Sequence, residues 1–302
     1  MSDSNTKWPA RFGLLKTAIV IGLLCLAPAQ PRAQDRALSP ESTLSGVLSR
    51  GQIRVCFEAG YLPFEMVGTR SGLRERSLRP ADERRGGQVT QFGGFDIDLA
   101  REMARQLGVD FVPVNTRWNS IIPSLTLGRC DIIISGMSAT NARRRSVDFS
   151  DPYMRIGQTV LLNAELAGRI ASHDDLNDAR YTVASKPGTT GEAAVARFMP
   201  EAEYRPFESE MEAANAVAAG EVDALVYDQP FNATFIAMTG SENVVFLDQP
   251  FTDEAIAFAI RKDDPDFLAW LNQFLGDIRA DGRYDRIHRK WFQSTDWFDL
   301  YR

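Results

Sequence analysis

The chain has 302 residues, of which 44% are hydrophobic and 25% are charged, and its 34 basic and 40 acidic residues give a net charge of −6. This composition excludes global disorder and predicts a folded chain of one large or two ordinary domains. Because the balance is acidic, nucleic acid and anionic membranes are not expected as partners. The two histidines leave little material for a histidine-based zinc site or a Ser-His-Asp triad, so we expect no metal, no cofactor and no catalytic residues of that kind.

Residues 1–29 have the pattern of a secretory signal peptide. Lys7, Arg11 and Lys16 form a basic stretch before the apolar run "TAIVIGLLCLA", and the small residues of "APA" offer a cleavage position. The run is shorter than the roughly 20 apolar residues that span a bilayer. We therefore expect export to a soluble extracytoplasmic compartment and a mature charge of −8, from 31 basic and 39 acidic residues.

Two cysteines remain in the expected mature chain, Cys56 and Cys130. An oxidising compartment would allow a disulfide between them. Each lies in or beside an apolar strand, however, where a small thiol packs without the restrictive geometry that a disulfide requires. We therefore expect two buried free cysteines.

Short apolar strands alternate with amphipathic helices in the first half, which is typical of α/β units. Strands are predicted at 53–57, 110–114 and 131–135, and helices at 97–108 and 120–128. The segment 67–91 is rich in arginine and poor in apolar residues, which predicts a surface loop, with a docking element for a partner as the alternative.

The pattern repeats in the second half. Strands are predicted at 181–185 and 222–228, and helices at 190–199 and 209–220. A strand at 255–260 and two more helices follow, which we expect to pack back on the first lobe with Trp270, Phe274, Trp291 and Phe292 in the core. The sequence therefore predicts two α/β lobes, each with its own sheet.

Ligands of open α/β sheets bind beyond the carboxyl ends of the strands, and polar side chains follow four of the predicted strands. With two glycines included, the residues that follow these strands are Glu58, Tyr61, Gly136, Ser138, Thr140, Arg143, Lys186, Gly188, Thr189, Thr190 and Asp228. A carboxylate is bound by a guanidinium group, hydroxyls and free amides at a helix N-terminus, which Arg143, Ser138 and the turn "GTTG" supply. An ammonium group needs acceptors, and Asp228 supplies one. An α-amino acid carries both groups on one carbon, although each residue alone also has a structural explanation.

Four segments, 94–108, 117–153, 186–192 and 220–230, carry the motifs T-x-x-R, D-F-S-x-P-Y and G-T-T together with a late aspartate. In them the chain resembles the extracellular solute-binding proteins of family 3, the polar amino-acid receptors of ABC importers. The resemblance implies an α/β, type II periplasmic-binding-protein fold, in which two lobes joined by two hinge strands close on a ligand. The first lobe would comprise 40–157 and 251–302, and the second 158–250. It further implies a periplasmic monomer without catalytic activity, with an amino-acid ligand and a membrane permease of an ABC importer as partners.

The resemblance also assigns roles at the α-carbon end of the ligand. Arg143 and Ser138 match residues that bind the α-carboxylate, aided by the second-lobe turn with Thr189 and Thr190. Asp228 matches the acid that holds the α-ammonium group. Of the three consecutive arginines, Arg143 is then expected to face the cleft, and its two successors to be solvated.

Two charged positions bear on specificity. Glu58 matches an acidic position of basic amino-acid and glutamine receptors, and Lys186 matches a lysine of glutamine-type receptors. A basic ligand would suit Glu58 but be repelled by Lys186 unless the two pair, so we expect a polar neutral ligand such as glutamine first, and arginine or lysine next. The remaining matches, through aromatic or backbone contacts, are Tyr61, Trp118, Ser135 and Gly136.

Two alternatives remain open. Periplasmic cyclohexadienyl dehydratases resemble these receptors and carry a glutamate near the second-lobe turn, where this chain has Glu192. A carboxylate in the first turn of a helix is also explained by the helix dipole. The other alternative is a soluble adaptor that signals to a membrane protein.

Overall fold

In a computed structural model of the protein, the described residues are 38–68 and 92–300. The expected signal peptide at 1–29 lies outside them, as does all of the arginine-rich segment 67–91 except its first two residues. Within these ranges, none of the helices combines the length and apolar character needed to cross a membrane.

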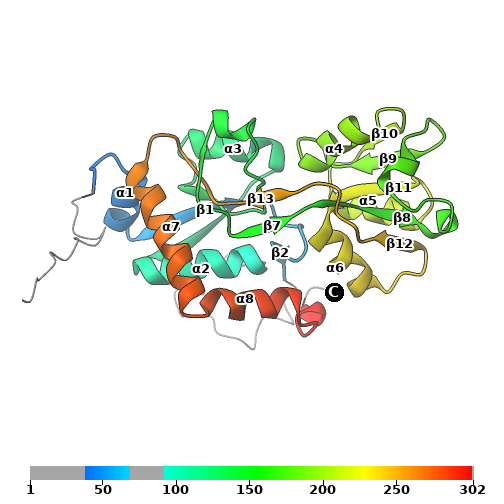
Figure 1. The fold of residues 1–302 in the computed structure, drawn as a ribbon. Helices are drawn as coiled ribbons and strands as arrows, with labels where there is room; N and C mark the ends of the chain where they lie inside the picture. The colour runs from blue at the N-terminus through cyan, green and yellow to red at the C-terminus, as the bar shows by residue number, and fades with distance from the viewer. Residues whose placement is uncertain (1–37, 69–91, 301–302) are drawn as a thin grey trace, which may run out of the picture. The chain divides into compact units, whose positions relative to one another are not determined.

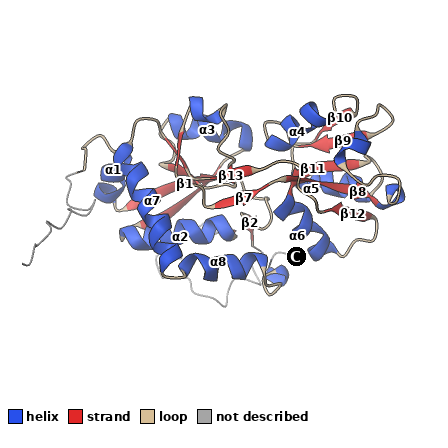
Figure 2. Cartoon of the chain, viewed as in Figure 1, coloured by secondary structure: helices blue, strands red, loops and turns tan. Residues whose placement is uncertain are grey.

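The first lobe is built on a five-stranded sheet. Its strands lie in the order β4 (Asp110–Asn115), β1 (Gln52–Phe57), β5 (Ile132–Ile133), β14 (Ala259–Ile260) and β6 (Asp148–Phe149). Strand β1 is labelled in Figures 1 and 2. β1 is parallel to β4 and β5, whereas β14 is antiparallel to β5 and β6. The helices of this lobe are α1 (Thr43–Arg50), α2 (Phe95–Leu107), α3 (Trp118–Thr126), α7 (Pro265–Ala280) and α8 (Arg283–Phe292).

The second lobe repeats the plan with a sheet of its own. Its strands lie in the order β10 (Glu203–Pro206), β9 (Thr182–Ser185), β11 (Ala224–Asp228), β8 (Gln158–Asn163) and β12 (Val244–Leu247). β9 is parallel to β10 and β11, and β8 is antiparallel to β11 and β12. Its helices are α4 (Thr190–Phe198), α5 (Glu210–Ala218) and α6 (Gln229–Thr239).

Two short strands connect the lobes. β7 (Met154–Ile156) leads from the first sheet to the second, and β13 (Glu254–Ile256) leads back; the two pair antiparallel and run side by side between the lobes in Figure 1. The predicted strand at 255–260 is therefore wrong in one respect, because it divides into β13 and β14. Phe258 lies at the division, where its N–H donates to Ser150 Oγ at 3.1 Å as the chain enters the first sheet.

Local sequence explains how the helices begin and end. In α2 the residues Leu99, Ala100 and Met103 recur at helical spacing and are buried, and Gly108 ends the helix with a φ of 70°. Of the four aromatic residues predicted to lie in the core, Phe274 and Trp291 are buried, and Trp270 and Phe292 are partly buried and pack against it. β2 (Met66–Val67) pairs with β3 (Phe92–Gly93) antiparallel.

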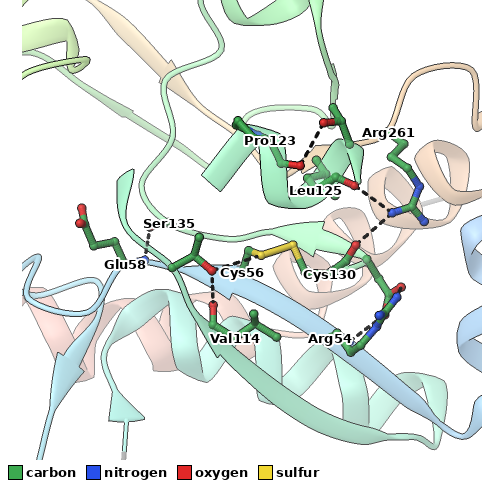
Figure 3. Close-up of a disulfide and its surroundings, with 12 residues drawn as sticks. Arg54, Cys56, Glu58, Val114, Pro123, Leu125, Cys130, Ser135 and Arg261 are labelled. Atoms are coloured by element: carbon green, nitrogen blue, oxygen red, sulfur yellow. Dashed lines mark hydrogen bonds and ion pairs between the residues drawn. A yellow bond between two sulfur atoms is a disulfide. The ribbon is translucent and has the colours of Figure 1, made fainter. Parts of the chain in front are cut away.

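Cys56 and Cys130 form a disulfide, so the prediction of two free cysteines is wrong (Figure 3). Both are fully buried, as expected. β1 and β5 are neighbours in the first sheet, and this places the two Cα atoms 5.7 Å apart, within the range that a disulfide requires. Which strands are neighbours cannot be inferred from the spacing of two cysteines. The disulfide joins the strand that leads to Glu58 to the segment that leads to Ser135.

Candidate ligand-binding site

A pocket of about 360 Å³, part of it open to solvent, is lined by side chains of both lobes. It brings together all eleven residues predicted from the sequence and adds Tyr227. Those eleven are Glu58, Tyr61, Trp118, Ser135, Gly136, Ser138, Arg143, Lys186, Thr189, Thr190 and Asp228.

The first-lobe wall begins where β1 and β5 end. Ser135 Oγ accepts a hydrogen bond from the N–H of Glu58 at 3.1 Å, which ties the two strand ends together. Gly136 has a φ of 48°, and a Cβ there would lie 2.3 Å from Tyr61 Cε1, so the tyrosine ring requires glycine. The N–H of Gly136 donates to Asp96 Oδ2 at 2.6 Å, which leaves its carbonyl as the group it can offer to a ligand.

Arg143 extends across the first-lobe wall from a short 3₁₀ helix. Its guanidinium donates from Nη1 to the Ser138 carbonyl at 2.9 Å and from Nη2 to the Gly188 carbonyl at 3.2 Å, and lies 4.9 Å from the ring centre of Trp118. Burial lowers the pKa of Arg143, but an arginine stays charged at neutral pH. The next two arginines, 144 and 145, are exposed, as expected for solvated neighbours.

The second-lobe wall is the turn between β9 and α4. Thr189 caps α4, since its Oγ1 accepts from the N–H of Glu192 at 3.4 Å and donates to the Lys186 carbonyl at 2.7 Å. A Cβ on Gly191 would lie 2.5 Å from Ser185 Oγ, so glycine lets α4 approach the sheet closely. The first N–H groups of a helix lack intrahelical partners, which suits this turn to binding a carboxylate.

Asp228, at the end of β11, supplies the acid of the pocket. Its carboxylate accepts hydrogen bonds from the hydroxyl of Tyr61 and from Gln158 Nε2, the latter at 2.5 Å. Burial raises its pKa to about 7, and the negative charge of Glu254 adds to the rise. A cation placed beside such a buried carboxylate stabilises its ionised form.

Sequence reasoning missed Glu254, which joins this acid to the connecting strand β13. Glu254 Oε1 accepts from Gln158 Nε2 at 3.0 Å, and Glu254 Oε2 accepts from Ser138 Oγ at 2.6 Å. The hydrogen of the Ser138 hydroxyl is therefore directed to Glu254. The one available signal was a charged residue directly before the apolar strand predicted at 255–260.

At the other end of the pocket, Lys186 bonds to two carboxylates. Its Nζ donates to Glu58 Oε2, and to Glu210 Oε2 at 2.8 Å. Glu58 Oε1 also accepts from the N–H of Trp118 at 3.0 Å. The exposed fraction is 6% for Lys186 and 2% for Glu210. Glu210 was also missed, because in sequence it is an ordinary residue at the start of a helix.

Comparison with known families identifies the chain. Residues 53–294 match the family model of the bacterial extracellular solute-binding proteins, family 3. The protein belongs to this family. Both the predicted family and the predicted α/β fold with two sheet-containing lobes are thereby confirmed.

This solute-binding protein is similar to several known proteins. The ABC transporter glutamine-binding protein GlnH of Bacillus subtilis is 34% identical over 67% of this chain and 73% of its own, and a probable histidine-binding protein of Neisseria gonorrhoeae is 29% identical over 79% and 82%. Among solved structures, an ancestral amino acid-binding protein described as a precursor of cyclohexadienyl dehydratase is 41% identical, with a TM-score of 0.72 over 83% of this chain and 99% of that one. A binding component of an ABC transporter from Wolinella succinogenes, complexed with lysine, is 38% identical, with a TM-score of 0.74 over 83% of this chain and 99% of that one.

In this solute-binding protein, contacts between the lobes converge on the pocket. Glu58 pairs with Lys186, and Tyr61 donates to Asp228. Trp118 Nε1 donates to the Gly188 carbonyl at 2.9 Å, beside the bond from the Arg143 guanidinium. Several residues that line the pocket, among them Glu58, Tyr61 and Arg143, thus also hold its two walls together.

Proposed function

We propose that this protein is a periplasmic receptor that captures a polar amino acid, glutamine-like or basic, and delivers it as a monomer to the membrane permease of an ABC importer. The observation that carries the proposal is the presence of Arg143 and Asp228 in one pocket, on opposite lobes. Arg143 would bind the α-carboxylate together with the Thr189–Thr190 turn, and Asp228 would bind the α-ammonium group. The glutamine, histidine and lysine named for the relatives and the solved structure support an amino-acid ligand.

Capture would occur by closure of the cleft. We infer that residues 40–157 and 251–302 move as one body and 158–250 as the other, with β7 and β13 as the hinge. A ligand held by Arg143 on one lobe and by Asp228 on the other favours the conformation in which both contacts form. Glu254 lies on β13 and contacts Gln158, which bonds to Asp228, so the ammonium site is hydrogen-bonded to the hinge.

Calorimetric titration of the purified chain with each of the twenty amino acids tests this proposal. We expect binding of a polar amino acid, and a loss of affinity of at least about tenfold in Arg143→Ala, because a charge-assisted hydrogen bond is lost. Arg145→Ala is the matched control, since Arg145 is exposed, and it should bind as the unchanged chain does. If no amino acid binds, the proposal is wrong.

The dehydratase alternative has less support from the geometry. Glu192 Oε2 accepts from the N–H of Gly188 at 2.8 Å and Oε1 accepts from the Tyr204 hydroxyl at 3.2 Å, and Glu192 is absent from the residues that line the pocket. A carboxylate engaged in this way stabilises the turn, which is the structural role that the helix dipole also explains. Incubation with prephenate or arogenate should yield no aromatic product, and turnover would show that the protein is an enzyme.

A further inference from the structure

Glu210 is a buried acid directly behind the pocket. It is the first residue of α5, it is 2% exposed, and it is not among the residues that line the pocket. Its Oε2 accepts from Lys186 Nζ, which reaches the pocket from the second lobe. Glu210 therefore does not contact a ligand directly, and it acts on one through its own negative charge and through the position of Lys186.

Lys186 is held between two carboxylates rather than presented as a free cation. Although burial lowers the pKa of Lys186, Glu210 and Glu58 raise it by more, and the ammonium stays protonated. One positive charge thus faces two negative charges, and the group formed by Glu58, Lys186 and Glu210 has a net charge of −1. The repulsion that Lys186 would exert on a basic ligand is compensated inside the protein.

Two further ionisable groups lie near these three side chains. The carboxyl of Glu65 is buried, and burial raises its pKa well above the usual range, which favours its uncharged form. Tyr227, which lines the pocket, has a raised pKa because of burial and then because of the charges of Glu210, Asp228 and Glu58. The negative charges of Glu210, Asp228 and Glu58 thus all act on Tyr227 in the pocket wall.

We propose that Glu210 makes this end of the pocket anionic and thereby selects amino acids with a cationic side chain, lysine or arginine, over glutamine. The inference rests on the proposed function. A cationic side chain neutralises the remaining charge in a partly buried pocket, where Coulomb attraction is stronger than in water. A neutral amide can accept from Lys186 and donate to Glu58, but it leaves the charge uncompensated.

Calorimetry with lysine, arginine and glutamine tests this selection in the unchanged chain and in Glu210→Gln. The unchanged chain should bind lysine or arginine at least about tenfold more tightly than glutamine. Glu210→Gln should remove most of that preference, because it lowers the affinity for lysine and arginine about tenfold. Glu212→Gln is the matched control, because Glu212 is an exposed carboxylate on the same helix. It should retain the full preference.

A double variant separates charge from structure. Glu210→Gln with Lys186→Gln removes one charge of each sign, so Glu58 keeps the net charge at −1 and the preference for cations should persist. If Glu210→Gln weakens all three ligands equally, or if the double variant loses the preference, Glu210 is only structural and the inference is wrong. Tighter binding of glutamine than of lysine and arginine by the unchanged chain overturns this inference alone, whereas binding of no amino acid overturns the proposed function itself.

Discussion

The two lobes build their walls of the pocket in different ways. The first-lobe wall is supported from within its own lobe, by the disulfide behind Glu58 and by the hydrogen bonds of Ser135 and Gly136. The second-lobe wall is a short turn and a strand end, and Lys186, Gly188 and Asp228 all have bonding partners in the first lobe. Within its own lobe, the second-lobe wall is held by hydrogen bonds such as those from Lys186 to Glu210 and from Gln158 to Asp228, whereas the first-lobe wall also has a covalent crosslink.

Removal of the disulfide should have the largest effect, which is a loss of stability of the first lobe. In the variant Cys56→Ala with Cys130→Ala, the free energy of unfolding should fall by about 4 kcal/mol, because the crosslink closes a loop with a sequence separation of 74. Urea denaturation measures this change, with the reduced and oxidised forms of the unchanged chain as controls. Free thiols in the native oxidised chain, or equal stability of the two forms, would contradict it.

Asp228, at the end of β11 in the second lobe, should make the ligand affinity depend on pH. The pKa of Asp228 is about 7, mainly because of burial, and an ammonium group binds the ionised form. Below pH 7 the carboxyl must lose a proton before it can bind, so affinity should fall about tenfold per pH unit towards pH 5 and level off above pH 7.

Calorimetry between pH 5 and pH 8 measures this dependence, and two variants sharpen it. Asp228→Asn should bind weakly without the dependence. Glu254→Gln should move the fall in affinity to lower pH, because the charge of Glu254 contributes to the raised pKa. A flat profile in the unchanged chain would show that Asp228 does not hold the ammonium group.

Loss of a single hydrogen bond between the lobes should have the smallest effect on ligand affinity. Trp118→Phe removes the bond from Nε1 to the Gly188 carbonyl but keeps an aromatic ring beside Arg143. A neutral hydrogen bond contributes about 1 kcal/mol, so affinity should fall about fivefold. Trp270→Phe, in α7 and outside the pocket, is the control. Equal affinity in both variants would show that this contact does not assist closure.

Much of the candidate site was predictable because its residues follow strand ends. Arg143 and Asp228 bear groups whose chemistry complements an amino acid, and parallel sheets gather such positions at one edge. Glu210 and Glu254 were not predictable in the same way. Each lies in a regular element and joins the site through side-chain contacts, Glu210 to Lys186 and Glu254 to Ser138 and Gln158.

The sequence by itself determined the two lobes and the polar residues at their strand ends, because apolar periodicity and local chemistry are properties of neighbouring residues. Only the tertiary structure decided which strands are adjacent, and hence that Cys56 pairs with Cys130. It also decided the charge of the pocket, since Lys186 meets Glu58 across 128 positions of sequence and Glu210 across 24. Charge balance depends on distances in space, and those distances are set by the packing of the two lobes.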